Sequence, residues 1–177
     1  MSLTHLVVMG VSGCGKSTVA RRLGQELGWV FAEGDGFHPA ANVAKMSAGV
    51  PLTDEDRWPW LDAIVAWTSR QHACGHATVV ACSALRRAYR DRLRATPGHT
   101  PVCHLTGSEA VVAQRLAVRV GHFMPPSLLR SQLASLEPLE PDEAGFTLDI
   151  AAPIAALVGQ ARTAIEAAAR RHPAPAD

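Results

Sequence analysis

The sequence has few cysteines, no long apolar run and almost no excess of charge. The four cysteines are scattered and form no C-x-x-C pair: Cys14, Cys74, Cys82 and Cys103. This spacing argues against a disulfide-stapled small domain and against a zinc module, so we expect reduced thiols in a cytoplasmic protein. The apolar run Leu6–Met9 is too short for a signal peptide, and no stretch approaches the length of a membrane span.

The charge balance also argues against nucleic acids and anionic membranes as binding partners. The 177 residues carry 17 Lys+Arg against 16 Asp+Glu, and 47% of them are hydrophobic. The hydrophobic content is that of a globular chain, and the near-neutral balance gives no general reason to expect a nucleic acid or an anionic membrane as partner. Any anion must therefore be bound by a local arrangement of donors.

Short apolar runs alternate with longer amphipathic ones along the chain. The pattern predicts five strands, at His5–Met9, Trp29–Ala32, Thr78–Cys82, Val102–Leu105 and Phe146–Ile150. It predicts helices at Lys16–Leu27, Pro59–Ala73, Leu85–Ala95, from a capping box at Thr106–Glu109 to Val120, at Ser127–Leu136, and from Ile154 onward. This alternation indicates an α/β fold with a mostly parallel sheet covered on both faces. We expect a single domain over residues 1–170, followed by a frayed tail at 171–177.

The first predicted strand is followed by a glycine-rich segment that fits the phosphate-loop pattern G-x-x-x-x-G-K-[ST]. The glycines let backbone N–H groups point inward at phosphate oxygens, and the helix that follows turns its positive dipole end to them. Lys16 adds a positive charge, and the Ser17 hydroxyl is a ligand for Mg²⁺. The predicted nucleotide-binding residues are Gly10, Val11, Ser12, Gly13, Cys14, Gly15, Lys16, Ser17 and Thr18. Strand, loop and helix occur in the expected order, so the segment predicts binding of a nucleoside triphosphate.

Three classes of protein use such a loop: small-molecule kinases, GTPase switches, and ATPases or nucleic-acid motors. A GTPase needs N-K-x-D, but the only asparagine, Asn42, is followed by Val43. A motor would need a longer chain and an acidic residue at the end of the third predicted strand, and Thr78–Cys82 ends without one. The sequence therefore favours a kinase.

A second polar segment, Glu33–Pro39, follows the second predicted strand. Asp35 is placed to accept a hydroxyl proton during phosphoryl transfer; alternatively, it is a turn residue beside two glycines. Glu33 is a candidate for holding a metal-bound water. A histidine such as His38, taken on its own, is more often a surface-loop residue.

Basic residues further along are candidates for binding the acceptor and the transferred group. Lys45, Arg57 and Arg86 lie in loops or at helix starts, where each is either a carboxylate-binding donor or a solvated charge. The Gly- and Pro-containing segment 119–126 is either a lid that brings Arg119 over the phosphates or an ordinary connection between helices.

Taken together, these segments make the chain resemble the bacterial-type gluconate kinase family. The resemblance is carried by GVSGCGKS at Gly10–Ser17, EGDGFHP at Glu33–Pro39, KMSAGVPLTDED at Lys45–Asp56, RWPWL at Arg57–Leu61, VVACSAL at Val79–Leu85, YRD at Tyr89–Asp91, HFMP at His122–Pro125 and SQLASLEPLEPDE at Ser131–Glu143. It implies transfer from ATP with Mg²⁺ to the 6-hydroxyl of D-gluconate. It also implies a P-loop NTPase-type three-layer sandwich with a five-stranded parallel sheet and a helical lid, similar to shikimate and adenylate kinases.

The resemblance also implies roles for individual residues. Lys16, Asp35 and Arg119 would be catalytic, and Ser17 with Glu33 would serve the metal. The acceptor site would comprise Asp35, His38, Lys45, Arg57, Arg86 and His122. Arg86 stands where the family usually has lysine, and Gly36 where it often has a polar residue. Family members are commonly dimers. A kinase for another small sugar acid and a non-catalytic nucleotide sensor are the alternatives.

Overall fold

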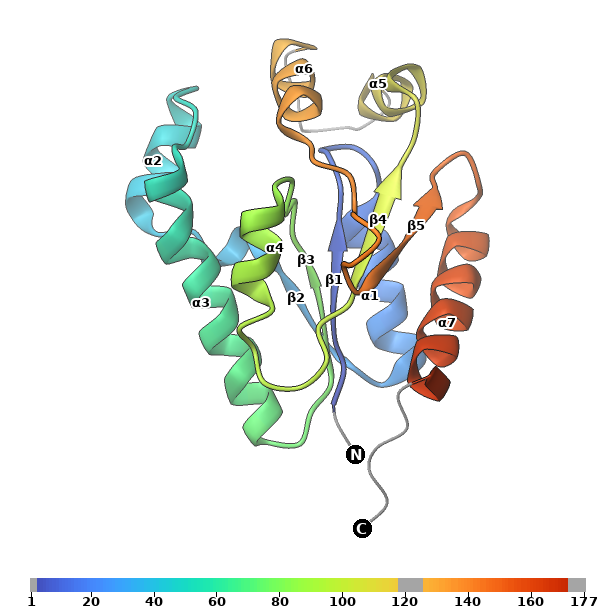
Figure 1. Cartoon of the computed structure of the whole chain (residues 1–177). Coiled ribbons are helices and arrows are strands. Elements are labelled where there is room, and N and C mark those ends of the chain that lie inside the picture. The colour runs from blue at the N-terminus through green and yellow to red at the C-terminus, as the bar shows by residue number, and fades with distance from the viewer. Residues whose placement is uncertain (1–2, 118–125, 172–177) are drawn as a thin grey trace.

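The computed structural model describes residues 3–117 and 126–171, and this part of the chain contains one five-stranded sheet. The strands are β1 (His5–Met9), β2 (Val30–Glu33), β3 (Thr78–Ala81), β4 (Val102–Thr106) and β5 (Gly145–Asp149). All neighbouring strands are parallel, and their spatial order is β2-β3-β1-β4-β5 (Figure 1). The central strand β1 is buried along its whole length, as its unbroken apolar sequence predicts.

Helices cover both faces of this sheet and its upper edge. They are α1 (Lys16–Leu27), the short 3₁₀ helix η1 (Gly34–Phe37), α2 (Ala40–Ser47), α3 (Asp54–Ala73), α4 (Arg87–Leu93), α5 (Glu109–Ala117), α6 (Pro126–Ser135) and α7 (Ile154–Arg171). Figure 1 shows α5 and α6 above the carboxyl ends of the strands, where ligands of open parallel sheets bind.

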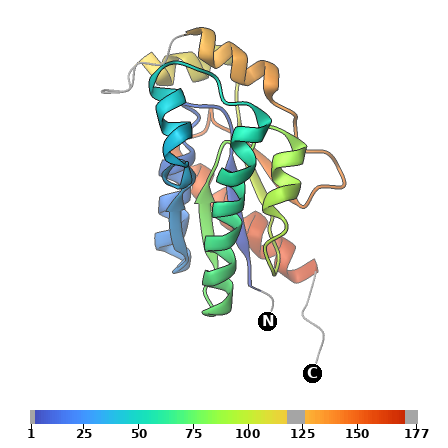
Figure 2. The same cartoon turned by 90° about the vertical axis from the view of Figure 1, so that its left-hand side faces the viewer.

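The alternation of side chains along β1 explains the three layers. Leu6 and Val8 point to one face, where they join the cluster that includes Leu23 of α1 and Leu157 of α7. Val7 and Met9 point to the other face and join residues of α3 and α4, including Trp60, Leu61, Ile64, Tyr89 and Leu93. Figure 2 shows α3 and α4 side by side. The predicted α/β fold with a five-stranded parallel sheet is confirmed.

Most predicted elements agree with the structure to within one or two residues. β1 and α1 have the predicted bounds, whereas β2 and β5 are displaced by one residue from the predictions. The basic helix α4 is shorter than the predicted Leu85–Ala95. α7 extends to Arg171, one residue into the predicted tail. Residues 172–177 lie outside the described residues.

The segment between β2 and β3 differs from the prediction. It contains α2, which was predicted as loop, and α3 begins at Asp54 rather than at Pro59. Thr53 caps α3: its hydroxyl accepts the N–H of Asp56, and the Asp56 carboxylate accepts the N–H of Thr53. This capping box fixes the earlier start, so Pro59 lies inside the helix and not in its first turn.

The predicted capping box at Thr106–Glu109 is wrong. Thr106 remains in β4, where it pairs with Asp149, and the next helix is capped by Ser108, whose hydroxyl accepts the N–H of Val111 at 3.3 Å. Strand pairing across the sheet extends β4 by one residue beyond its predicted end.

All four cysteines are free thiols, and three of them are buried. None of the helices in the described ranges is long and apolar enough to cross a membrane.

Candidate active site

The phosphate loop connects β1 to α1 through a backbone that only glycine readily adopts. Gly10, Gly13 and Gly15 have φ angles of 148°, 83° and 95°, all in the region that L side chains avoid. A Cβ on Gly10 would lie 2.6 Å from the carbonyl oxygen of Leu105, so β4 also leaves no room for a side chain. The loop therefore has the glycine-dependent shape that the sequence predicts.

Lys16 and Ser17 form the first turn of α1, with Gly15 as the N-cap. The Lys16 ammonium donates to the carbonyl oxygen of Val11 at 3.0 Å and so lies across the loop. No side chain caps the free N–H groups of this helix start. They remain available to phosphate oxygens, and the positive end of the helix dipole favours an anion at this position.

Gln132 of α6 contacts the same loop, although the sequence analysis gave it no role. Its carbonyl oxygen accepts the N–H of Ser12 at 2.7 Å, and its amide nitrogen donates to the Ser12 hydroxyl at 3.2 Å. The contact joins residues 120 positions apart. The S-Q dipeptide was visible in the sequence, but nothing local indicates what a glutamine on a distant helix will touch.

Arg115 is a second residue near the loop to which the sequence analysis assigned no role. It lies at the end of α5, its guanidinium donates to the carbonyl oxygen of Ile150, and it is 3.5 Å from the position of a Cβ built on Gly15. A positive charge is thus held beside the phosphate loop by a backbone carbonyl.

The acceptor side begins where β2 ends. Gly34 packs so closely against β3 that a Cβ there would be 2.5 Å from the carbonyl oxygen of Ala81. Its own carbonyl accepts the indole N–H of Trp60 at 2.7 Å, which ties the η1 turn to α3. The ring of His38 stacks on Trp60 with centroids 4.2 Å apart. Asp35, held in this turn, keeps 80% of its side chain exposed.

The sheet order places the two sides of the predicted site next to each other. Lys16 opens the helix that follows β1, Glu33 is the last residue of β2, and Asp35 lies in the turn after it. Cys82 directly follows β3, between β1 and β2 in the sheet. The predicted base, the predicted metal-site carboxylate and the phosphate-loop lysine therefore lie around one strand end.

Arg57 and Arg86, both predicted to bind the acceptor, are brought together around Asp54. Arg86 donates to the Asp54 carboxylate at 3.0 Å, Arg57 lies 3.7 Å from it, and the Tyr89 hydroxyl also donates to it. Both guanidinium groups lie over the Tyr89 ring, at 5.6 and 6.0 Å from its centroid. One carboxylate thus already sits between two arginines, although neither Asp54 nor Tyr89 was predicted to be at the site.

Lys45, the third basic residue predicted to bind the acceptor, pairs with a different carboxylate, that of Asp56. Its ammonium donates to both carboxylate oxygens of Asp56, at 2.7 and 2.8 Å. The lysine contact is the largest cause of a lowered pKa at Asp56, and the N–H of Thr53 adds to it. Lys45 is therefore in a position to bind an acceptor only if it leaves or shares Asp56.

The predicted metal residues are Ser17 and Glu33. Within residues 3–117 and 126–171 no group of three or more His, Cys, Asp or Glu side chains could hold a metal ion. Mg²⁺ in nucleotide sites takes one or two protein oxygens and completes its shell with phosphates and water. A hydroxyl and a carboxylate of this kind fit that requirement. Arg119, His122 and the predicted lid as far as residue 125 lie outside the described residues, and Pro126 is the first residue of α6.

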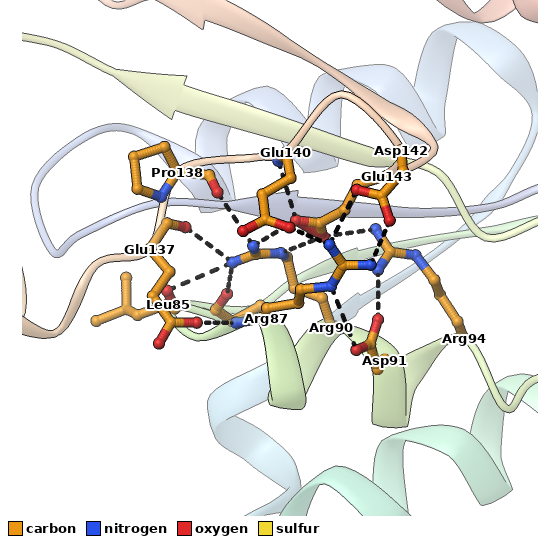
Figure 3. Close-up of polar contacts among 11 residues, drawn as sticks. Leu85, Arg87, Arg90, Asp91, Arg94, Glu137, Pro138, Glu140, Asp142 and Glu143 are labelled. Carbon is orange, nitrogen blue, oxygen red and sulfur yellow. Dashed lines mark hydrogen bonds and ion pairs between the residues drawn. The ribbon is translucent and has the colours of Figure 1, made fainter.

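A network of arginines and carboxylates supports the loop that follows β3 (Figure 3). Arg90 of α4 is wholly buried; it binds both oxygens of the Glu143 carboxylate and donates to the carbonyl oxygens of Ala84 and Leu85. Ala84 has a φ of 43°, a strained value for a residue with a side chain. The network therefore fixes the turn that leads into Arg86.

A phosphate loop on a five-stranded parallel sheet, facing a carboxylate and two arginines, defines a P-loop kinase. A family model described as an AAA domain matches residues 6–139. The gluconokinase of Gluconobacter oxydans (strain 621H) is 54% identical over 138 residues, which cover 78% of each chain. The crystal structure of a gluconokinase from Sinorhizobium meliloti 1021 has a TM-score of 0.87 at 45% identity, covering 95% of this chain and 94% of that one. An unliganded sugar kinase from Janibacter sp. HTCC2649 has a TM-score of 0.88 at 49% identity, covering 93% of this chain and 95% of that one. The chain belongs to the gluconokinase family.

Proposed function

We propose that the protein transfers the γ-phosphoryl group of ATP, with Mg²⁺, to the 6-hydroxyl of D-gluconate. The observation that supports this function most is the sheet order: Lys16 follows β1, Glu33 and Asp35 lie at the end of β2, and these two parallel strands flank β3. Arg57 and Arg86 are gathered around Asp54. A phosphate site, a carboxylate base and a paired set of carboxylate-binding arginines are what a sugar-acid kinase requires. Relatives named gluconokinase, of nearly the same length, support the choice of substrate.

We propose a role for each residue; that of Arg119, which lies outside the described residues, rests on the resemblance to the family alone. The loop amides and Lys16 hold the phosphates of ATP, while Ser17 and Glu33 would hold Mg²⁺, which neutralises phosphate charge when bound. Asp35 orients the acceptor hydroxyl and accepts its proton. Arg57 and Arg86 bind the carboxylate of gluconate in place of that of Asp54. Arg119 supplies positive charge to the transferred group. Positioning and electrostatics provide most of the rate.

The experiment that tests the substrate is an assay of ADP release with a panel of sugar acids. Gluconate should give the highest kcat/KM. If another aldonate or a shikimate-like acid is clearly preferred, the protein is a kinase with a different acceptor. ATP binding by calorimetry without turnover on any acid would make it a nucleotide sensor.

The role of Asp35 is tested by Asp35→Asn. The variant keeps the size of the side chain but cannot accept the proton, so we expect kcat to fall by about 10²-fold or more while ATP still binds. Because Asp35 is 80% exposed and lies in a turn, the fold should be unaffected. A kcat close to that of the wild type would remove Asp35 from the role of base.

A further inference from the structure

The buried side chain of Asn42 controls a group at the acceptor site. Asn42 lies on α2 and is only 3% exposed. Its amide nitrogen is 2.8 Å from the carbonyl oxygen of Asp56 and 3.3 Å from Nδ1 of His38. An amide nitrogen carries two hydrogens and accepts none. The Asp56 carbonyl can only accept, so it fixes the orientation of the amide and leaves the second hydrogen for His38.

This contact determines where His38 carries its proton. Because Asn42 donates to Nδ1, that nitrogen must present its lone pair, and the proton of the neutral ring is on Nε2. Burial, followed by the charge of Arg57, lowers the pKa of His38, while the charge of Asp35 opposes them. Stacking on Trp60, with ring planes 17° apart, holds the orientation of the ring. Nε2–H then faces Asp35.

The distance between the two side chains leaves room for one oxygen atom. Nε2 of His38 is 4.0 Å from the nearer carboxylate oxygen of Asp35, too far for a direct hydrogen bond. An oxygen placed about 2.8 Å from each atom would bond to both. It must accept from His38 and donate to Asp35, and a hydroxyl group does both. A carboxylate would be repelled by Asp35, and an ammonium group has no lone pair for Nε2–H.

We propose that Asn42 is a positioning residue that holds His38 as the Nε2–H tautomer, so that His38 and Asp35 together select a hydroxyl group. Asn42 touches neither ATP nor acceptor in this arrangement and acts through His38. The identity of that hydroxyl as one belonging to gluconate rests on the proposed function. The tautomer itself does not, because it follows from contacts within the chain.

The direct test is the ¹⁵N spectrum of the histidine side chains in the substrate-free protein at neutral pH. The His38 signals are identified by their loss in His38→Gln. We expect His38 to show a protonated Nε2 and an unprotonated Nδ1. A ring protonated at Nδ1, or at both nitrogens, overturns the proposal. Because no substrate is present, this result is independent of whether gluconate is the acceptor.

A double-mutant cycle tests whether Asn42 acts through His38. Asn42→Asp replaces the donor by a carboxylate, which draws the ring proton to Nδ1 and should lower kcat/KM for gluconate roughly tenfold. The same substitution in a His38→Gln background should lower kcat/KM much less, because a glutamine side chain has no ring proton whose position could change. An equal loss in both backgrounds would show that Asn42 only supports the fold. Val43→Asp is the control: it adds the same charge to α2 at a side chain that is 47% exposed, and kcat/KM should not change.

Discussion

At the scale of single residues, Gly10 shows how tightly the phosphate loop is constrained. In Gly10→Ala the new Cβ would meet the backbone oxygen of Leu105 at 2.6 Å, at a φ of 148° that alanine rarely adopts. Neither the backbone of Gly10 nor that of Leu105 can move away without displacing β1 or β4. We expect the substitution to lower the free energy of unfolding by about 2 kcal/mol or more, measured by urea denaturation.

The same substitution at Gly159 provides a matched control. Gly159 is exposed in the interior of α7, and a Cβ there meets nothing within 4 Å. Gly159→Ala should stabilise the protein by about 0.5–1 kcal/mol, because alanine loses less backbone entropy in a helix. If the two variants shift stability by the same amount, the steric account of Gly10 is wrong.

His5 makes stability depend on pH at a position far from the active site. Its ring contacts the hydroxyl of Thr78 and Nδ1 of His72. Burial, and then the neighbouring His72, lower the pKa of His5 from 6.5 to about 4. Since the folded pKa lies below the unfolded one, the contribution is complete above pH 6.5 and is lost as pH falls from 6.5 to 4. The loss should reach about 2 kcal/mol at pH 5.

Urea denaturation at pH 7.5 and pH 5 measures this loss, and His5→Gln should reduce it. The exposed His76, whose ring is hydrogen-bonded to Gln71, serves as the control, and His76→Gln should leave the pH dependence unchanged. A His5→Gln variant that loses as much stability at pH 5 as the wild type would contradict the assignment.

At the scale of elements, the Arg90–Glu143 pair joins α4 to the segment between α6 and β5 (Figure 3). Both side chains are wholly buried, and the arginine holds the pKa of Glu143 down at about 2. Glu143→Leu leaves the guanidinium buried without its carboxylate. We expect it to cost about 3–5 kcal/mol of unfolding free energy.

Two further variants test whether the loss of stability in Glu143→Leu comes from the burial of the ion pair rather than from the loss of any ion pair. Arg92 of the same helix pairs with Asp62 at the surface, with both side chains about half exposed, so Arg92→Ala should cost less than about 1 kcal/mol. The double variant Arg90→Met/Glu143→Leu should recover part of the loss, because no buried guanidinium is left without its carboxylate, while the carbonyl oxygens of Ala84 and Leu85 lose a donor. Equal costs for the buried and the surface pair would show that burial does not govern the network.

The elements differ in how far the sequence predicted them, and the differences have physical causes. The predicted bounds of β1 and α1 are confirmed because the sequence marks them clearly. Gly10 follows the apolar run of β1, and Gly15 and Gly28 flank α1. α2 was missed because it has only eight residues, too few for a helical repeat to stand out, and lies in a segment with Gly and Pro on both sides. The start of α3 was wrong because Pro59 was assigned to a first turn, whereas the T-x-x-D box at Thr53 was already present in the sequence.

The site shows the same division. The glycine-dependent shape of the phosphate loop was predictable because its residues are contiguous. The roles of Asp35 and His38 stay predictions, made from a local motif. The contacts of Ser12 with Gln132, and of Arg90 with Glu143, join residues 120 and 53 positions apart. Spacing within one element cannot predict such pairs. Asn42 was used only to argue against a GTPase, and its donor role depends on the helix that was missed.

At the scale of the whole molecule, the sheet brings the two halves of the proposed site to one edge. The proposed nucleotide side comes from β1 and α1, and the proposed acceptor side from the η1 turn, α2 and α3, which follow β2 in the chain (Figure 1). Ligands that bind only the folded state raise the melting temperature. MgATP at 100-fold its Kd should stabilise the protein by about 2.7 kcal/mol, or roughly 5–10 °C, and gluconate should give its own shift.

Because the two sites share an edge but no residues, single substitutions should abolish one shift and leave the other. Lys16→Ala should remove most of the MgATP shift and keep that of gluconate, while Arg57→Met should do the reverse. Calorimetric scans of both variants with each ligand alone provide the measurement. If Lys16→Ala loses both shifts, the acceptor side depends on an intact phosphate loop, and the two sites are coupled rather than independent.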